Sequence, residues 1–307
     1  MTQTKQHSTF AIAALLLLAL LARAAIAQPE CANPKALGTS RILSFGTQGG
    51  LAVGLKTYPQ TLALEDHELV LTFDDGPLPA TTTLVLDALA KECVRATFFL
   101  IGRNAAAAPA LVKREIADGH TVAHHTFSHP GVTLRNYTQA KGEADIERGF
   151  AADDAAAYGD ATNAPRVPFF RFPGFADTTR LLRWLDSRDI AVFGADIWAS
   201  DWEPMTPAEE LDKLMARVEK AGRGIVLMHD IKTQTAAMLP AFLRALKKSG
   251  YRVVHIEPGI GKAQTRLAPD RWTSETDRAL ERLGYVERPD DALPPLAHRK
   301  LPLKGPL

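Results

Sequence analysis

The residues best suited to chemistry in this sequence fall into short clusters, and the first cluster pairs two acids. Asp74 and Asp75 follow the apolar run 68–73 and precede Gly76 and Pro77. Because Gly76 and Pro77 bend the chain, both carboxylates can face one site, where a metal would hold one as an anion and the other could act as a base. Taken alone, the same four residues are also typical of an Asx-type turn or a helix cap with solvated acids.

The second cluster is rich in histidine and follows another short apolar run. His125 and His129 are four residues apart, which would place both imidazoles on one side of a helical turn and within reach of one ion. Two imidazoles and one carboxylate leave a position for water, as in catalytic rather than closed structural zinc sites. By itself such a pair is more often structural, and His124 must point elsewhere if His125 points into a site, so we interpret His124 as structural.

Three further clusters contain one ionisable residue each at the end of an expected strand. Arg171 lies between two phenylalanines and needs an anion, which a carboxylate of the first cluster would supply; the same contact would also serve as a structural salt bridge. Asp201 lies in the segment 198–202, between two tryptophans. His229 ends the apolar run 224–228, and a neighbouring carboxylate would keep it protonated near neutral pH, as a general acid requires. Alone, it is more often a core histidine.

The elements that must position these clusters alternate along the chain. We expect strands at 68–73, 95–101, 120–123, 169–171, 190–194, 224–228 and 251–254, and helices at 82–91, 105–118, 139–158, 181–186, 206–220 and 236–248. Apolar strands alternating with amphipathic helices favour an α/β fold in which parallel strands form a single barrel-like domain, over about residues 65–260. In such barrels the active site gathers at the carboxyl ends of the strands, which is where the five clusters lie.

The composition is that of an ordinary globular protein. The 307 residues are 46% hydrophobic and carry a formal charge of +1, from 36 Lys and Arg against 35 Asp and Glu. These values exclude a disordered tail protein, a collagen-like repeat and a multi-span membrane protein. Because there is no excess of positive charge to follow a phosphate backbone, nucleic acid is not an expected partner. Composition gives no indication of the oligomeric state.

The N-terminal segment has the pattern of a secretory signal. Lys5 precedes the apolar run 10–22, and residues 25–27 read Ala-Ile-Ala, so we expect a signal peptide over 1–27 and export to the periplasm or the extracellular space. The run is short for a membrane span, so no stable span is expected after cleavage. An uncleaved N-terminal anchor, supported by Arg23 just after the run, is the alternative.

The remaining segments lie outside the expected barrel. Residues 28–64 show weak periodicity and are interpreted as an N-terminal flank covering the domain, and residues 261–307 as a C-terminal extension with one helix at 273–283 and a Pro-rich tail. In an oxidising compartment Cys31 and Cys93 can form a disulfide. Cys93 precedes an apolar strand and equally fits a buried thiol.

In this order and at these strand ends, the five clusters resemble the polysaccharide deacetylase family (carbohydrate esterase family 4, the NodB homology domain). The resemblance covers about residues 65–256, and its most specific parts are the Asp-Asp-Gly-Pro and His-Thr-x-x-His segments. It implies a distorted (β/α) barrel, in agreement with the pattern of elements. It also implies that Asp74 is the catalytic base, that Arg171 orients Asp74, and that a divalent metal binds at the residues Asp75, His125 and His129. The metal implied is most often Zn²⁺, with Co²⁺, Ni²⁺ and Mn²⁺ as alternatives.

The resemblance assigns the remaining roles as well. Asp201 would hold and tune His229, the general acid, while Trp202 and Leu227 would shape the pocket for the sugar and the acetyl methyl group. The third segment departs from the common Arg-Pro-Pro-Tyr-Gly form, because only Pro173 of the substrate-facing residues is kept and Gly174 replaces the aromatic. The N–H of Gly174 would still polarise the acetyl carbonyl, but the altered groove floor bears on the identity of the substrate.

The function implied is hydrolysis of N-acetyl groups in an N-acetylglucosamine-containing glycan, giving acetate and a free amine. Two alternatives remain: an O-acetyl esterase acting on a xylan-like glycan, and a catalytically silent carbohydrate-binding relative, which would be expected to lack the base, a ligand or the acid. The sequence does not distinguish chitin oligomers, peptidoglycan and exopolysaccharide as the glycan.

Overall fold

A computed structural model describes residues 31, 33–131, 134–161 and 164–285. The chain divides into two units, residues 1–32 and 33–307, and the description that follows concerns the second. The expected signal peptide and Pro-rich tail fall outside the described residues. Among the described residues, no helix has both the length and the apolar character needed to cross a membrane.

The centre of the unit is a sheet of parallel strands in the order β1-β11-β4-β5-β6-β7-β8-β2, with β10 paired to both β4 and β9. The bounds are β1 Thr39–Gly46, β2 Leu51–Val53, β4 Glu68–Asp74, β5 Thr97–Leu100, β6 Thr121–His124, β7 Phe169–Phe170, β8 Ala191–Phe193, β9 Ile197–Trp198, β10 Gly224–His229 and β11 Arg252–Lys262. A separate antiparallel pair joins β3 (Gln60–Leu62) to β12 (Thr265–Leu267). The parallel arrangement confirms the predicted α/β class.

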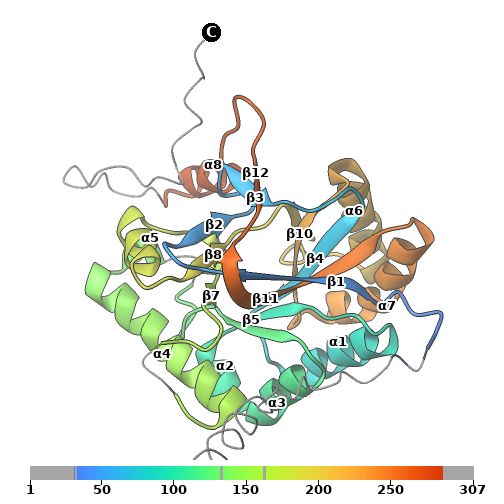
Figure 1. The fold of residues 1–307 in the computed structure, drawn as a ribbon, viewed down its shortest axis with the longest axis horizontal. Coiled ribbons are helices and arrows are strands. Elements are labelled where there is room, and N and C mark those ends of the chain that lie inside the picture. Colours follow the sequence, from blue (N-terminus) through green and yellow to red (C-terminus); the bar gives the residue numbers. More distant parts are fainter. Residues whose placement is uncertain (1–30, 32, 132–133, 162–163, 286–307) are drawn as a thin grey trace, which may run out of the picture. The chain divides into compact units, whose positions relative to one another are not determined.

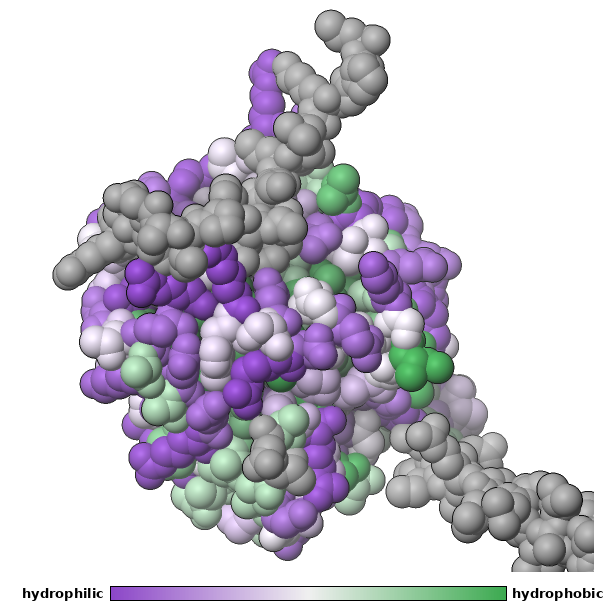
Figure 2. All heavy atoms as spheres, turned by 60° about the vertical axis from the view of Figure 1, so that its left-hand side comes forward, coloured by the Kyte–Doolittle hydropathy of each residue, from purple (hydrophilic) through white to green (hydrophobic). Residues whose placement is uncertain are grey.

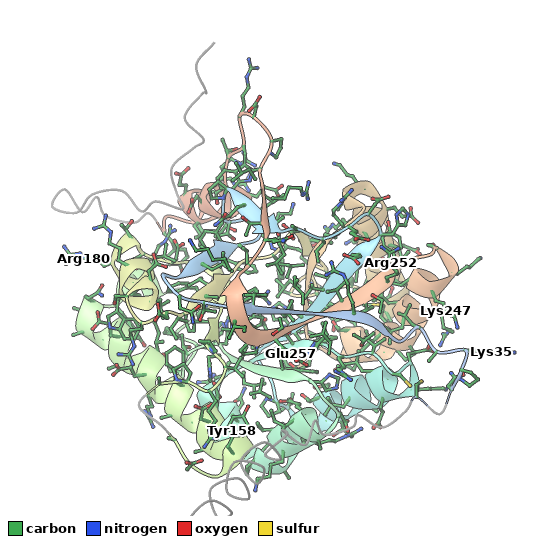
Figure 3. The ribbon with its side chains drawn as sticks, in the orientation of Figure 1. Lys35, Tyr158, Arg180, Lys247, Arg252 and Glu257 are labelled. Carbon is green, nitrogen blue, oxygen red and sulfur yellow. The ribbon has the colours of Figure 1, made fainter. Side chains whose placement is uncertain are left out.

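Helices surround these strands (Figure 1). They are α1 Pro79–Lys91, α2 Gly102–Ala107, α3 Pro109–Ala117, α4 Gln139–Tyr158, α5 Thr179–Asp186, α6 Pro207–Ala221, α7 Thr233–Lys248 and α8 Glu275–Arg282, with 3-10 turns at Leu134–Asn136 and Pro173–Phe175. Thr206 caps α6 through a capping box with Glu209, as its position before an apolar-periodic segment predicts. Side chains fill the space between strands and helices (Figure 3).

The strands have cores on both faces. Phe98 and Phe99 are adjacent on β5 and both are fully buried, yet they belong to different hydrophobic clusters. Successive side chains of a strand point to opposite faces, so one phenylalanine packs toward α1 and α7 while the other packs among the strands. This double burial explains why the sequence shows these strands as continuous apolar runs rather than alternating ones. The outer face shown in Figure 2 is mainly hydrophilic, with hydrophobic residues in small separate groups.

Two expectations about the elements need correction. The helix expected over 105–118 is two helices, α2 and α3, because Pro109 disfavours helical geometry at Ala108, which has φ −134° and ψ 53°. The segment 28–64, interpreted as a flank, supplies β1 and β2 to the sheet, where they pair with β11 and β8. The side chains of β1 are mostly half-buried or exposed, which explains its weak hydrophobic pattern.

The state of the two cysteines decides between the disulfide and the buried thiol that the sequence left open. Neither Cys31 nor Cys93 is free, and both are disulfide-bonded. Cys93 lies two residues beyond the end of α1, in a left-handed conformation with φ 51°. A buried thiol at Cys93 is therefore excluded.

Candidate active site

Asp74 ends β4 at the carboxyl edge of the sheet, and its side chain is almost wholly buried. Its Oδ1 accepts a hydrogen bond from Nη1 of Arg171 at 2.6 Å. Burial raises the pKa of Asp74, and the positive charge of Arg171 acts against this rise. The anion that the sequence required for Arg171 is thus a carboxylate of the first cluster, as predicted.

Arg171 is fully buried, which is costly for a cation unless every donor is satisfied. Beyond Asp74, its guanidinium donates to Thr72 Oγ1 at 2.9 Å and to the carbonyls of Phe193 and Gly194 at 3.2 and 3.0 Å. It also lies over the ring of Phe99, at 4.1 Å from the centroid. These contacts come from three strands and a loop, so the guanidinium has one orientation and fixes that of Asp74.

Asp75 lies just beyond the strand in a left-handed conformation, with φ 78°. Its N–H donates to the carbonyl of Phe99, and its own carbonyl accepts from Asn104 Nδ2 at 2.8 Å. The next residue must be glycine, because a Cβ on Gly76 would lie 2.1 Å from a carboxylate oxygen of Asp230. The sharp turn brings the Asp75 carboxylate to the same side of the sheet as Asp74, as the sequence predicts for the Gly-Pro bend.

Asp75 Oδ1 converges with two imidazole nitrogens. It lies 3.5 Å from Nε2 of His125 and 3.3 Å from Nε2 of His129, and among the described residues it has no hydrogen-bond partner. The ligand atoms of the three residues all lie within 4.8 Å of one another. His125 Nδ1 lies 2.8 Å from the carbonyl of Arg171, an interaction that leaves Nε2 free to bind an ion, as is usual for metal-ligating histidines.

The donor set fits a divalent ion. Burial and the nearby His129 lower the pKa of His125 to about 3, so this ring is neutral at physiological pH and its Nε2 keeps a lone pair. One carboxylate oxygen and two imidazole nitrogens leave further positions open, in agreement with the catalytic type of site expected from the sequence.

The sequence predicted that a helical turn brings His125 and His129 together. The two rings do lie close together, but the prediction of a helical turn was wrong. Residues 125–129 form no helical turn. Thr126 and His129 have φ values of 66° and 44°, and the N–H of His129 donates to Thr126 Oγ1 at 3.0 Å. The loop is pressed against α4, where a Cβ on Gly149 would lie 2.6 Å from the Thr126 backbone. A tight left-handed loop, not a helix, therefore brings the two rings together.

His124 points away from this group, as interpreted from the sequence. It is fully buried, and its Nδ1 lies 2.8 Å from Asp153 Oδ2 on α4. Its ring also packs edge-on against Phe150. His124 thus ties β6 to α4 and belongs to the core.

Asp201 and His229 form a second buried pair. His229 Nδ1 lies 2.7 Å from Asp201 Oδ1, and the backbone N–H of His229 donates to Oδ2 at 2.7 Å. Burial alone lowers the pKa of His229, but the negative charge of Asp201 and its hydrogen bond raise it to about 9. The Nε2 atom of His229 faces the candidate metal ligands and lies 4.0 Å from Asp75 Oδ2. The predicted carboxylate partner of His229 is therefore present.

A cavity of about 430 Å³ opens onto these residues. Of the predicted substrate-binding residues, Gly174, Trp202 and Leu227 line it, whereas Pro173 is buried and does not. Pro173 instead begins the 3-10 turn in which Gly174 adopts φ 59°, so it shapes the backbone rather than the cavity surface.

Several lining residues were missed in the sequence. Phe175 stacks on Trp198 with ring centroids 6.0 Å apart, and Lys232 lies just beyond β10. A further wall comes from the C-terminal segment, through the residues Thr276, Ala279, Leu280 and Leu283. Their spacing is that of one helix face, a pattern that predicts packing against the domain but not against the site.

A second cavity of about 790 Å³ adjoins the first. Trp198, Trp202 and Ala279 line both. Trp202 is 47% exposed, and its ring stands perpendicular to that of His229, with centroids 6.1 Å apart. Trp198 and Trp202 thus form a wall shared by two cavities beside the paired acids, histidines and arginine.

Comparisons with known proteins agree with this geometry. The family profile described as polysaccharide deacetylase matches residues 62–189. The chain is 32% identical over 200 residues to a peptidoglycan-N-acetylglucosamine deacetylase of Listeria monocytogenes, a match that covers 65% of this chain but only 40% of that protein. It is 32% identical over 210 residues to a chitooligosaccharide deacetylase of Sinorhizobium fredii, covering 64% of this chain and 93% of that protein.

A solved structure shows the same fold. A peptidoglycan deacetylase of Bdellovibrio bacteriovorus superposes with a TM-score of 0.64 at 29% identity, covering 76% of this chain and 63% of that one. The matched region contains a parallel-stranded barrel-like domain of the kind that the sequence predicted.

Proposed function

This chain belongs to the polysaccharide deacetylase family, and from that premise we propose that it is an exported, metal-dependent N-deacetylase. Its substrate would be a glycan containing N-acetylglucosamine, and its products acetate and a free amine. The observation that carries the proposal is the placement of the Asp75, His125 and His129 group between two pairs of opposite character. On one side is the Asp74 carboxylate held by Arg171, and on the other the His229 imidazole held by Asp201.

A divalent ion held by Asp75, His125 and His129 would polarise the acetyl carbonyl and lower the pKa of water. Asp74 would take the proton of the attacking water, and the distance of 3.9 Å between its Oδ2 and His125 Nε2 supports this role. Arg171 keeps this carboxylate oriented, and its positive charge favours the ionised form against the effect of burial. The N–H of Gly174, on the cavity wall, would donate to the developing oxyanion.

His229 completes the reaction. The carbon–oxygen bond to water forms and the carbon–nitrogen bond of the acetamide breaks, so the leaving nitrogen needs a proton. With a pKa raised to about 9 by Asp201, His229 holds that proton at neutral pH. The proton that Asp74 accepts and the proton that His229 donates balance over one turnover.

The shape of the site favours an oligomeric substrate. The adjoining cavity shares Trp198 and Trp202 with the first, so a sugar next to the acetylated one would have an aromatic surface to contact. The two relatives described above are named as deacetylases of peptidoglycan N-acetylglucosamine and of chitooligosaccharide, names that favour an amide substrate over the O-acetyl esters of xylan.

Export is supported by the N-terminal pattern and by the disulfide-bonded cysteines, because disulfides persist in oxidising compartments. Its test is the N-terminal sequence and location of the protein expressed with residues 1–27. A mature N-terminus at residue 28 in the periplasm or medium would support export with cleavage. Retention in the cytoplasm would reject it.

The decisive experiment is acetate release from a panel of glycans after chelation and metal add-back. The panel contains N-acetylglucosamine oligomers, peptidoglycan fragments and acetyl-xylan. Metal-dependent release from the first two would support the proposal, and release from acetyl-xylan alone would make the protein an O-acetyl esterase. Retention of a glycan without release under any metal would make it a silent carbohydrate-binding relative.

A further inference from the structure

A buried glutamate that the proposed mechanism does not use lies behind Asp201. Glu210, on α6, has no exposed surface. Its Oε1 lies 2.9 Å from Thr235 Oγ1 on α7, and its Oε2 has no hydrogen-bond partner among the described residues. An ionised carboxylate so poorly satisfied is costly to bury.

Thr235 stands between two carboxylates. Its Oγ1 lies 2.8 Å from Asp201 Oδ2 and 2.9 Å from Glu210 Oε1. A hydroxyl carries one proton and so donates to one acid at a time. If both acids were ionised, one of these two contacts would join oxygens with no hydrogen between them. One carboxyl must therefore supply a proton of its own.

The contacts identify which acid carries the proton. Asp201 accepts the backbone N–H of His229 and pairs with its ring, so it is the better stabilised anion. Within the described part of the chain, the Glu210 carboxyl has the Thr235 hydroxyl as its one hydrogen-bond partner. Burial and the negative charge of Asp201 raise the pKa of Glu210 to about 7, while Thr235 and the charge of His229 act in the opposite direction.

We infer that Glu210 is a positioning residue that, as a neutral carboxylic acid, donates to Thr235, which donates to Asp201 and thereby fixes His229. This inference rests on the proposed role of His229 as general acid. The series of hydrogen bonds runs from Glu210 on α6, through Thr235 on α7 and Asp201 in the loop after β9, to His229 at the end of β10. Every member but His229 is almost wholly inaccessible, so the relay is shielded from competing water.

Infrared spectroscopy tests the protonation state without any substrate. The wild type at pH 5.5 should show a carboxylic acid C=O band that weakens by pH 8.5 and that E210Q lacks in the difference spectrum. The control E219Q, an exposed position on the same helix, should keep the band. A spectrum of E210Q identical to that of the wild type in this region would overturn the inference.

Kinetics test the positioning role. The side chain of E210Q keeps an N–H donor for Thr235, whereas that of E210L does not. The kcat of E210Q should therefore exceed that of E210L about tenfold, with equal KM values. The same ordering is expected for T235S over T235V, with folding of each variant checked by circular dichroism. Equal losses in E210Q and E210L would overturn the inference.

The two proposals can fail separately. If the wild type released no acetate from any glycan, the proposed function would fall, while the infrared spectra would still decide whether Glu210 is protonated. In that case the ring nitrogens of His229, followed by NMR, replace kinetics as the positioning readout. A His229 titration that shifts in E210L but not in E210Q supports the inference, and unchanged titrations in both contradict it.

Discussion

Asp74 and His229 are direct register partners at the carboxyl ends of the adjacent parallel strands β4 and β10. The proposed base and the proposed acid therefore start from neighbouring backbone positions, and each contacts a partner of a different charge. Asp74 meets the cation Arg171, and His229 meets the anion Asp201. Because the partners have opposite charge, Arg171 lowers the pKa of Asp74 against the effect of burial, while Asp201 raises that of His229, as the proposed roles of base and acid require.

Replacing Arg171 tests the first half of this relationship. In Arg171→Met, burial continues to raise the pKa of Asp74, and only the weaker opposing charges of His229 and His129 remain. We expect the acidic limb of the pH–rate profile to move to higher pH and kcat to fall at least about 100-fold. Unfolding in denaturant should show a loss of about 3–5 kcal/mol at neutral pH, because Asp74 is left as an unpaired buried charge.

Two other arginine variants control this measurement. Arg171→Lys keeps the charge but not the planar contacts, and should lie between the wild type and Arg171→Met. Arg114→Met removes a half-buried arginine on α3 that pairs with Asp87, outside the site, and should leave the profile unchanged. An acidic limb at the same pH in all four proteins would contradict the role given to Arg171.

The basic limb should report His229. Its pKa of about 9 lies above the usual value for histidine because of Asp201, so activity is present below that pH and is lost as pH rises through it. A divalent ion beside Asp75 repels the imidazolium, so the limb of the loaded enzyme lies below 9. Asp201→Asn should move the limb down by at least about one pH unit. A limb that stays in place in this variant would exclude His229 as its source.

The same pair contributes to stability with a defined sign. The pKa of His229 is higher in the folded than in the unfolded protein, so its contribution is complete below about pH 6.5 and disappears as pH rises toward 9. Denaturation of the wild type and Asp201→Asn between pH 6 and 10 measures it. Their difference in free energy of unfolding should shrink over this range.

Metal binding should be visible without catalysis. A ligand that binds only the folded protein stabilises it by about 4 kcal/mol at a thousandfold excess over Kd, so Zn²⁺ should raise the Tm of the chelated wild type by several degrees. Asp75→Asn and His129→Ala should lose most of this rise, and His67→Ala, an exposed histidine before β4, should keep it. A full rise in Asp75→Asn would place the ion elsewhere.

How far the sequence predicts this site depends on how local each determinant is. Asp74, Asp75 and His229 can be predicted as site residues from the sequence. Apolar strands end next to them, and parallel strands bring such ends together. That Arg171 pairs with a carboxylate of the first cluster followed from the cost of an isolated charge between aromatics, and only the family resemblance identified that carboxylate as Asp74. The conformation of the loop that joins His125 and His129 could not be predicted, because left-handed residues such as Thr126 leave no periodic hydrophobic pattern in the sequence.

Contacts between segments far apart in the sequence also could not be predicted. The β1 strand pairs with β11 from opposite ends of the domain, and its half-exposed faces weaken its pattern. The wall formed by Leu280 and Leu283 depends on where α8 docks, which contacts such as Arg135 with Asp277, at 3.0 Å, decide. Glu210 stands out only when Thr235 and Asp201 are seen beside it.

Two buried histidines far from the site should make the fold sensitive to acid. Burial lowers the pKa of His120 and of His255 to about 3. Nearby arginines act in the same direction on both rings, and the His120 ring does so on His255. Below about pH 6.5 the unfolded chain binds protons that the folded protein does not, so stability falls by about 1.4 kcal/mol per pH unit for each ring. Glu257, labelled in Figure 3, lies on β11. Its Oε1 lies 3.6 Å from His255 Nε2, but the side chain is too exposed to offset the loss of stability in acid.

Denaturation between pH 4 and 6.5 checks the slope. His255→Gln should flatten it by about the contribution of one ring, whereas His67→Gln, at an exposed position, should not. An unchanged slope in His255→Gln would mean that this ring is protonated in the folded state. Metal-free protein is used throughout, so that release of an ion does not contribute.

The shared wall of the two cavities predicts how activity depends on substrate length. Trp202 lines both cavities and is nearly half exposed, so its ring is available to a sugar that spans them. Trp202→Ala should raise KM about tenfold for an N-acetylglucosamine tetramer. The effect on a dimer should be smaller, because a short substrate fills only the cavity beside Asp75. Ile260→Ala removes an exposed side chain that lines neither cavity and serves as the control. Equal increases for dimer and tetramer would show that the second cavity takes no part in binding.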